Sequence, residues 1–292
     1  MTPTLLAAAA RFAEANADEH GVAATLVPGL AVVRETMPTA LQYAINRPLV
    51  ALVLQGHKHV AMGASTFDLH PGESLLITAD VPKVSQITEA NLARPYISIV
   101  FEIDPAVVAE LVTEMGAAPF LAGTPIRVDP TESEVADAAL RLLKLVDRPA
   151  TIPILQTQLL RELHFWLLSG RHGGAIRTLG ILGSHAQRIA RAVNLIRSQL
   201  AAPLRVEQLA SAAGMGLSAF HEHFRAITSL TPLQFQKKLR LIEARRLMLS
   251  AGEPISNAAY SVGYESVPQF TREYGRLFGV TPARDRRQQS VA

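Results

Sequence analysis

The sequence contains no cysteine among its 292 residues. That absence excludes disulfide bonds, thiol redox sensing, zinc fingers and a cysteine nucleophile. No run of apolar residues approaches the eighteen that a transmembrane helix needs, so we expect no membrane-spanning segment. The short apolar run near the N-terminus has no basic residue before it, which disfavours a secretory signal. We therefore expect a cytoplasmic protein whose N-terminus is an amphipathic helix or a loose arm.

Acidic residues are scarce in the last third of the chain. From Ser184 to Ala292 there are 15 Lys and Arg against 7 Asp and Glu, a net charge of +8. From Met1 to Gly183 the count is 13 against 18, a net charge of −5. A basic part joined to an acidic part indicates a polyanionic partner at one end only, although a solvated charged surface has the same composition.

The front part of the chain has the pattern of β-structure. Short segments rich in β-branched or aromatic residues alternate with turn signals such as Gly56, Gly63 and Pro71-Gly72. Short strands at close spacing are typical of a small barrel or sandwich. The expected strands cover residues 31–37, 49–55, 57–62, 65–70, 74–78 and 96–103.

Helical patterns follow the strands. Asp104 is placed to cap a helix that has Pro105 at its first position and ends at Gly116. Thr131 and Glu134 have the spacing of a capping box, which predicts that a second helix begins there.

A third helix is expected over 152–168, where Leu155, Leu159, Leu163 and Trp166 share one face. Its apolar stripe either packs on the strands or forms a homodimer interface, since a wide stripe with a Trp suits a binding hot spot. The Gly-rich stretch that follows, 172–184, is expected to be the interdomain linker, and the chain after it has a helical pattern.

Two stretches of the basic part repeat the same landmarks at a spacing of 49 or 50 residues. Each has a small residue where a second helix must pack closely, and a glycine four residues later that supplies the positive φ of a tight turn. This spacing predicts two helix-turn-helix units, joined by a long helix. The matched pairs are Ala210 with Ala259, Gly214 with Gly263, Phe220 with Phe270, Phe224 with Tyr274, and Thr231-Pro232 with Thr281-Pro282.

The second helix of each unit has an outward face that can enter a major groove. Arginine can reach guanine edges or phosphates, glutamate can accept from cytosine, and apolar side chains can touch a thymine methyl. The alternative interpretation of any single position is ordinary solvent-exposed helix surface. The expected DNA-contacting residues are Ser218, His221, Glu222 and Arg225 in the first unit, and Val267, Pro268, Gln269, Thr271, Arg272 and Arg276 in the second.

The last hundred residues resemble the AraC/XylS family of bacterial transcription regulators. The resemblance rests on LASAAGM with its two spaced phenylalanines, on LRLIEARRLML, and on ISNAAYSVGYESVPQFTREYGRLFGVTP. The family implies two helix-turn-helix units that read adjacent major grooves on one DNA face. Its base-reading positions fall on Ser218, His221, Glu222, Val267, Pro268, Thr271 and Arg272.

The first unit departs from this family pattern at two positions. Gly216 stands where the family usually has a serine that caps the first recognition helix. Glu222 stands where a positive or neutral residue is common. The second unit therefore matches the pattern more closely than the first.

The front part resembles the N-terminal domain of a subset of AraC-type regulators, through LVLQG followed by PGESLLITADVP. That resemblance implies a cupin-like β-barrel followed by helices. The expected fold is therefore α+β, with an N-terminal cupin-like barrel and trailing helices, then an all-α domain of two helix-turn-helix units joined by a long helix. The expected boundaries are 1–171 for effector sensing and dimerisation, 172–184 for the linker and 185–288 for DNA binding.

Two other functions compete with this interpretation. A metal-binding cupin enzyme is one, because His57, His59, His70 and Glu73 lie in the expected barrel, with Asp68 and His70 on one strand face. A non-specific architectural DNA-binding protein is the other, although such a protein has no need of an acidic front domain.

The residues and the resemblance together predict a sequence-specific transcription regulator, expected to be an effector-responsive activator rather than an enzyme. Its expected partners are the major groove of double-stranded DNA, a small-molecule effector, RNA polymerase if it activates, and a second copy through the 152–168 helix. We expect no cofactor, no bound metal and no membrane partner. The effector, the operator and the sign of regulation stay open.

Overall fold

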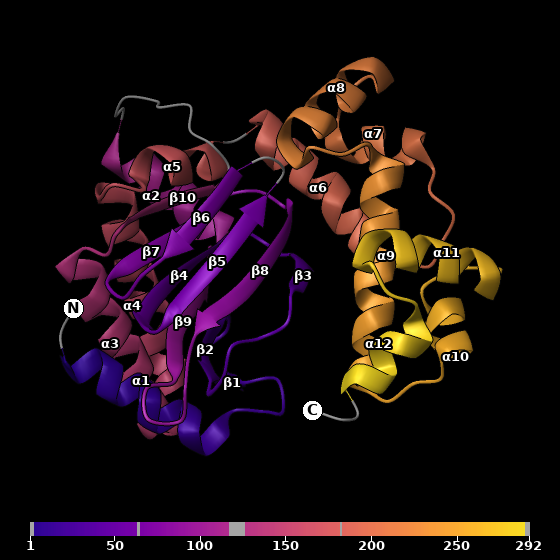
Figure 1. The fold of residues 1–292 in the computed structure, drawn as a ribbon. Coiled ribbons are helices and arrows are strands. Elements are labelled where there is room, and N and C mark those ends of the chain that lie inside the picture. Colours follow the sequence, from indigo (N-terminus) through magenta and orange to yellow (C-terminus); the bar gives the residue numbers. More distant parts are fainter. Residues whose placement is uncertain (1–2, 63–64, 117–125, 182, 290–292) are drawn as a thin grey trace. The chain divides into compact units, whose positions relative to one another are not determined.

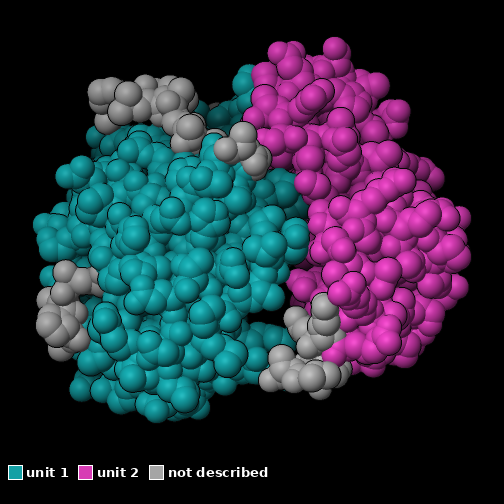
Figure 2. Space-filling view, viewed as in Figure 1, with its two compact units in different colours: residues 1–187 teal, residues 188–292 magenta. Residues whose placement is uncertain are grey.

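The computed structural model describes residues 3–62, 65–116, 126–181 and 183–289. The chain divides into two compact units, a front unit of residues 1–187 and a helical unit of residues 188–292 (Figure 2). Within the described ranges, no helix is both long and apolar enough to cross a membrane.

The front unit contains two antiparallel sheets (Figure 1). A six-stranded sheet has the order β1-β2-β9-β4-β7-β10, and a four-stranded sheet has the order β3-β8-β5-β6. The strands are β1 (Val22–Ala24), β2 (Leu30–Glu35), β3 (Gln42–Ile45), β4 (Leu49–Gln55), β5 (His57–Met62), β6 (Ser65–Leu69), β7 (Glu73–Ile77), β8 (Pro82–Glu89), β9 (Tyr96–Glu102) and β10 (Ile126–Pro130).

The front unit has a pair of sheets where the sequence predicts a closed cupin-like barrel. Each described strand pairs only with strands of its own sheet, so the ladder of hydrogen bonds does not run round to close a barrel. The inner residues of the two sheets form one apolar cluster, which holds them face to face. A mixed fold with sheets in front and helices behind is confirmed.

The six-stranded sheet is buried on both faces. On β4, Val50 and Leu52 pack against the helices, while Leu49 and Ala51 face the four-stranded sheet. This two-sided burial explains the nearly unbroken apolar run of β4. The helices on the outer face are α1 (Pro3–Asn16), α2 (Pro105–Met115), α3 (Ser133–Lys144), α4 (Ile152–Ser169) and α5 (Gly173–Gly180), with 3-10 turns η1 (Leu145–Asp147) and η2 (Pro149–Thr151).

One of the two predicted helix caps is present. The side chain of Asp104 accepts a hydrogen bond from the Ala106 amide at the start of α2, and Gly116 ends the helix with φ +70°. The capping box at Thr131 is wrong, because α3 begins at Ser133 and has no side-chain cap. The Thr131 amide instead donates to the Gly72 carbonyl, which continues the sheet edge.

Residues 172–184, expected to form the linker, contain helix α5. Ala175, Ile176 and Leu179 of α5 are buried in the core of the front unit. A Cβ on Gly180 would lie 2.7 Å from Val108 Cγ1 of α2, so this glycine permits close helix packing rather than flexibility.

The helical unit contains no strand among its described residues. Helix α9 contacts α8, α10, α11 and α12, so it joins the two helix-turn-helix units as the sequence predicts. Its helices are α6 (His185–Ser198), α7 (Val206–Ala213), α8 (Leu217–Thr228), α9 (Pro232–Leu249), α10 (Ile255–Ser261), α11 (Val267–Phe278) and α12 (Pro282–Gln289).

Candidate DNA-binding interface

The two predicted turns have the same backbone geometry. Gly214 follows α7 with φ +60°, and Gly263 follows α10 with φ +86°. The next residue in each unit donates back to the small residue of the preceding helix: Met215 to the Ala210 carbonyl at 2.9 Å, and Tyr264 to the Ala259 carbonyl at 3.0 Å. The repeated glycines therefore stand where a left-handed residue is needed, as the spacing predicts.

An arginine from another helix holds each turn. Arg188 of α6 donates from Nε to the Ala213 carbonyl at 2.8 Å. Arg240 of α9 donates from Nη1 to the Gly263 carbonyl at 2.9 Å. These charge-assisted bonds satisfy carbonyls that the helix ends leave open, and they fix each turn against its neighbour.

Arg240 is bonded more extensively than Arg188. Its Nε donates to Leu200, and its Nη2 donates to Ala201 and Ala202, all through backbone carbonyls in the α6–α7 connection. Gln236, one turn earlier on α9, also donates to two of these carbonyls. Helix α9 is therefore tied both to the segment that enters the first unit and to the turn of the second.

The inward face of each recognition helix is aromatic, as expected. Phe220 and Phe224 of α8 are fully buried, and so are Phe270 and Tyr274 of α11. Leu277, one turn after Tyr274 on α11, is only half-buried.

Phe278 is buried in place of Leu277. Its ring lies 4.4 Å from the Tyr274 ring, and the guanidinium of Arg245 stacks on it at 5.1 Å. This arginine contact comes from α9, so the pattern within α11 alone does not show it.

The outward positions of both helices face solvent to different degrees. Pro268 and the two arginines of α11 are exposed, as are all four expected residues of α8. Three others on α11 are half-buried. The exposed residues are Ser218, His221, Glu222, Arg225, Pro268, Arg272 and Arg276, and the half-buried ones are Val267, Gln269 and Thr271.

Arg272 and Arg276 lie one turn apart on α11. Neither side chain has a hydrogen bond or ion pair with any residue in the described ranges. Two unpaired guanidinium groups on one ridge of a helix are suited to guanine edges and phosphates. Gln269 differs, because its Nε2 donates to Glu273 Oε1 at 3.2 Å.

Glu273 accepts three hydrogen bonds that sequence reasoning missed. Lys237 of α9 donates at 3.0 Å and the Tyr264 hydroxyl at 2.8 Å, besides the amide of Gln269. Burial alone would raise the pKa of Glu273, but these three donors outweigh burial and lower it. Glu273 therefore stays ionised and fixes α11 against α9. Lys237 and Tyr264 lie 36 and 9 residues from Glu273 in the sequence, so these two partners leave no local signal.

Asp285 of α12 forms a second contact that sequence reasoning missed. Both carboxylate oxygens accept from Arg245, at 2.8 and 3.2 Å, and the Tyr274 hydroxyl donates to Oδ2 at 2.6 Å. Helix α12 is thereby held against α9 and α11.

The N-caps of the two recognition helices differ as the sequence indicates. Gly216 precedes α8 and supplies no side-chain cap. Ser266 precedes α11 and accepts from the Gln269 amide at 3.5 Å. The difference in stability is a few tenths of a kcal/mol.

The candidate metal ligands of the front unit occur as separate pairs. His59 Nδ1 lies 2.7 Å from Asp68 Oδ1, while the rings of His57 and His70 meet edge to face at 4.7 Å. His57 also contacts Glu89. Across the described part of the chain, no three His, Asp or Glu side chains are grouped as metal ligands.

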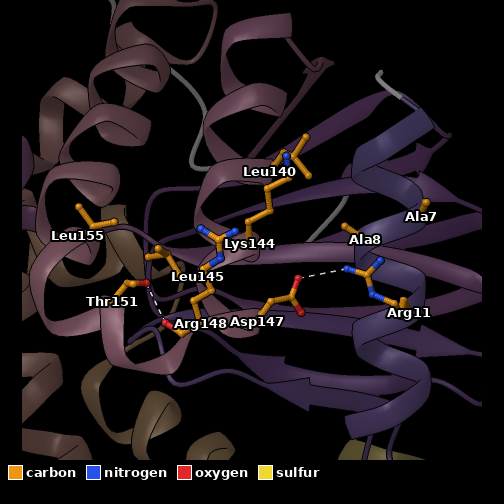
Figure 3. Close-up of a pocket in the computed structure, with 10 residues that line it drawn as sticks. All are labelled: Ala7, Ala8, Arg11, Leu140, Lys144, Leu145, Asp147, Arg148, Thr151 and Leu155. Carbon is orange, nitrogen blue, oxygen red and sulfur yellow. Dashed lines mark hydrogen bonds and ion pairs between the residues drawn. The ribbon is translucent and has the colours of Figure 1, made fainter.

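A cavity of about 540 Å³ opens on the helical side of the front unit (Figure 3). An ion pair between Arg11 of α1 and Asp147 of η1 spans it at 3.2 Å. Apolar residues line the rest of its wall together with two further basic groups. The lining residues are Ala7, Ala8, Arg11, Leu140, Lys144, Leu145, Asp147, Arg148, Thr151 and Leu155.

Models of known protein families match residues in both units. Residues 26–175 match the model of the AraC-type transcriptional regulator N-terminus, and residues 209–288 match a helix-turn-helix domain.

Known proteins with related sequences match part of the chain. The HTH-type transcriptional regulator ArgR of Pseudomonas aeruginosa is 30% identical over 107 residues, which is 37% of this chain and 32% of that protein. ExsA of the same species is 36% identical over 73 residues, 25% of this chain and 26% of ExsA. The chain thus spans about a third or less of the length of these relatives.

Most of the chain also resembles a solved structure. An apo crystal structure of ToxT from Vibrio cholerae superposes with a TM-score of 0.60 at 12% identity, over 88% of this chain and 97% of that one. At this identity the likeness concerns the fold alone. The fold of both parts is therefore one that a solved protein also has.

Proposed function

Because this chain belongs to the family of AraC-type transcriptional regulators, we propose that it is a sequence-specific regulator that reads DNA with α8 and α11. The observation that carries the proposal is the pair of braced helix-turn-helix units on one long helix. Each presents an exposed polar face and buries its aromatic residues. Helix α9 has 18 residues and is thus about 27 Å long, a length suited to spacing two helices along one side of a duplex.

Within this interface we assign different roles to different residues. Arg272 and Pro268, near the start of α11, contact base edges, and Arg276 contacts the backbone. Gln269 is a positioning residue, because its amide is bonded to Glu273. The expected contacts of α8 are Ser218, His221, Glu222 and Arg225, and those of α11 also include Val267 and Thr271.

A selection from random DNA with the full-length protein tests this function. We expect one enriched motif with two half-sites about one helical turn apart, because each recognition helix reads one major-groove segment. Excess random competitor DNA should leave binding to this motif largely intact. Equal binding to all sequences would favour the architectural protein and overturn the proposal.

The front unit is proposed to sense a small molecule and change DNA affinity or transcription. The support is its match to the AraC-type N-terminus, together with the acidic composition of the first 183 residues. Effector and DNA must then change each other's affinity by the same factor, if the coupling acts on binding. We expect loss of regulation on deletion of residues 1–170. Regulation that survives this deletion under every inducing condition would contradict the sensor role.

Activation through RNA polymerase and dimerisation through α4 are further parts of the proposal. Leu163 and Leu167 of α4 pack into the core of their own unit, which leaves Ile154 and Leu155 exposed at its start. We propose that these two side chains contribute to a homodimer. Sedimentation of an Ile154→Glu variant checks this, because the variant of a dimer built on α4 should remain monomeric at protein concentrations where the unmutated protein dimerises.

The arrangement that best supports the alternative of an enzyme is a buried group of Ser, His and Asp side chains. Ser74 Oγ lies 2.7 Å from His172 Nε2, and His172 Nδ1 lies 3.3 Å from Asp129 Oδ2. Ser74 is only 2% exposed, and the adjoining cavity of about 10 Å³ holds at most one water molecule. A substrate carbonyl cannot reach the hydroxyl, so we assign this group a structural role in joining the sheet to α5.

A further inference from the structure

The cavity of about 540 Å³ lies between α1 and the connection from α3 to α4 (Figure 3). Its volume is in the range of sites that hold small organic ligands. Helix α1 buries the stripe Leu5, Ala9 and Ala13, while its neighbouring Ala7 and Ala8 line the cavity. Small side chains at these two positions leave the space open, because a larger side chain would occupy part of it.

The opposite wall is formed where α3 ends. The chain leaves α3 after Lys144 and passes through η1 and η2 before α4 begins. In this connection the Arg148 amide donates to the Leu145 carbonyl, and the Thr151 amide donates to the Arg148 carbonyl. The connection is therefore a hydrogen-bonded corner, and both walls of the cavity belong to ordered elements.

The charge at the cavity is opposite in sign to that of the unit around it. Residues 1–183 have a net charge of −5, whereas the lining has three cations, Arg11, Lys144 and Arg148, against the single carboxylate of Asp147. The side chains of Lys144 and Arg148 form no hydrogen bond or ion pair with any residue in the described ranges. A basic cavity in an acidic unit is suited to an anion.

The ion pair that spans the cavity does not prevent an anion from binding. Arg11 and Asp147 lie 3.2 Å apart, and their side chains are 69% and 56% exposed. A pair this exposed contributes little to stability, so Arg11 can turn from Asp147 to a ligand at small cost. A purely structural role at the C-terminus of α3 would account for Lys144, but not for Arg11 or Arg148.

We propose that this cavity binds a small organic anion, with its charged group at Arg11 and Arg148 and its apolar body against Ala8, Leu140 and Leu155. The ligand class is a carboxylate, sulfonate or phosphate ester with an apolar body. The site lies on the helical face of the six-stranded sheet, away from the four-stranded sheet. The inference goes beyond the proposed function, because binding here does not depend on whether α8 and α11 read DNA.

Two matched fluorescent probes test the site on the full-length protein. The first is 8-anilino-1-naphthalenesulfonate, and the second is N-phenyl-1-naphthylamine, which has the same aromatic body without the charge. Titration of the protein into each probe measures the two affinities separately. The charged and the apolar parts of the site can then be removed one at a time.

Removal of one cation should affect the sulfonate alone. We expect Arg148→Met to weaken sulfonate binding about three- to tenfold, the range for a charged contact that solvent partly screens. Binding of the neutral probe should stay unchanged. Arg94→Met is the matched control, because it removes the same charge from an exposed position of the front unit outside the cavity lining, and it should change neither affinity.

Filling the cavity should affect both probes. Ala7→Leu and Ala8→Leu place a larger side chain in the space, so each should weaken binding of the sulfonate and of the neutral probe severalfold. Ala7 is exposed and Ala8 half-buried, so Ala7→Leu keeps the test valid if Ala8→Leu lowers the melting temperature. Equal sulfonate losses in Arg148→Met and Arg94→Met, or unchanged affinity for both probes in Ala7→Leu, would overturn the proposal.

The competing occupant of the cavity is a second copy of the chain. Leu155 belongs both to the cavity lining and to the exposed start of α4 that we propose as a dimer contact. We expect Ile154→Glu, the variant designed to stay monomeric, to bind the sulfonate as the unmutated protein does. A severalfold gain of sulfonate affinity in Ile154→Glu would show that the second copy covers the cavity, and it would overturn the assignment to a small anion.

Discussion

At the scale of single residues, we expect different residues of α11 to have different roles in DNA recognition. Arg272 is nearer the helix N-terminus and should reach deeper into the groove than Arg276. We predict that Arg272→Ala costs about 1–3 kcal/mol on the correct site and relaxes preference at one or two base pairs. Arg276→Ala should weaken binding to all sequences alike and lower the salt slope by about one unit. Parallel selections from randomised DNA with each variant measure both effects.

Folding of these variants provides the control for that prediction. Both arginines are exposed, so neither substitution should lower the melting temperature appreciably. Phe270→Ala should cost about 3–5 kcal/mol, because this side chain is fully buried. An Arg272→Ala variant that kept the parental site preference would show that this face of α11 does not enter the groove.

Asp285 gives the helical unit a sensitivity to acid. Burial opposes its charge, but hydrogen bonds from Arg245 and Tyr274 outweigh burial and lower its pKa below the ordinary value. A lowered carboxyl pKa stabilises the fold above the unfolded-state value, and this stability is lost as pH falls through the folded-state value. We predict that Asp285→Asn lowers stability by about 1–3 kcal/mol at pH 7 and that the difference shrinks below about pH 4.

Melting curves of residues 184–292 between about pH 7 and pH 2.5 measure this effect. Glu243→Gln is the matched control, since its partner Arg246 is 57% exposed and such a pair contributes little. A constant gap between Asp285→Asn and the parent down to the lowest pH would be incompatible with this role of the carboxylate.

At the scale of secondary-structure elements, the two turns should respond differently to the same substitution. Gly214 and Gly263 both have positive φ, so alanine at either position costs about 1 kcal/mol in backbone strain. A Cβ on Gly263 would also lie 2.2 Å from the Ala201 carbonyl oxygen, whereas on Gly214 it would meet only the flexible end of Arg188 at 3.4 Å. We predict that Gly263→Ala destabilises the helical unit clearly more than Gly214→Ala.

Chemical denaturation of the two alanine variants measures their free energies of unfolding. Equal values for Gly214→Ala and Gly263→Ala would contradict the prediction. A reduced cost in a Gly263→Asn variant, which tolerates positive φ better, would separate backbone strain from the clash.

Elements with a local signal were predictable from the sequence. Helix α2 has Asp104, Pro105 and Gly116 in the order that helix ends require. The turn glycines could be found because the unit occurs twice. Strand β8 was not predicted, since Pro82, Lys83 and Gln86 do not alternate as an ordinary strand does. Its structure depends on pairing with β3 and β5.

The sequence predicts the candidate site only at residues whose placement does not depend on a partner distant in the sequence. The exposed positions of α8 and α11 follow from helical periodicity around their buried aromatic residues. Apart from the Gln269 amide, four residues before Glu273, the partners of Arg240, Glu273 and Asp285 lie 9 to 40 residues away. No spacing rule connects such residues, so their side chains looked like ordinary surface charges.

At the scale of the whole molecule, the separation into two units predicts independent DNA binding. Residues 184–292 include all the helices from α6 to α12, and they carry a net charge of +8. We predict that this fragment folds and binds the selected motif, with affinity falling steeply as salt rises. Fluorescence anisotropy over about 50 to 300 mM salt measures the slope. A folded fragment without salt-dependent binding would contradict the prediction.

The bonds of Arg240 also limit how this protein can be recombined with its relatives. A chimera joined within α9 would take Arg240 from one parent and its acceptors near Leu200 or Gly263 from another. Backbone carbonyls accept from any correctly placed arginine, but the shape of the α6–α7 connection need not match. Hybrid regulators should therefore exchange the helical unit whole, with the junction before Arg188, so that the two recognition helices are inherited together.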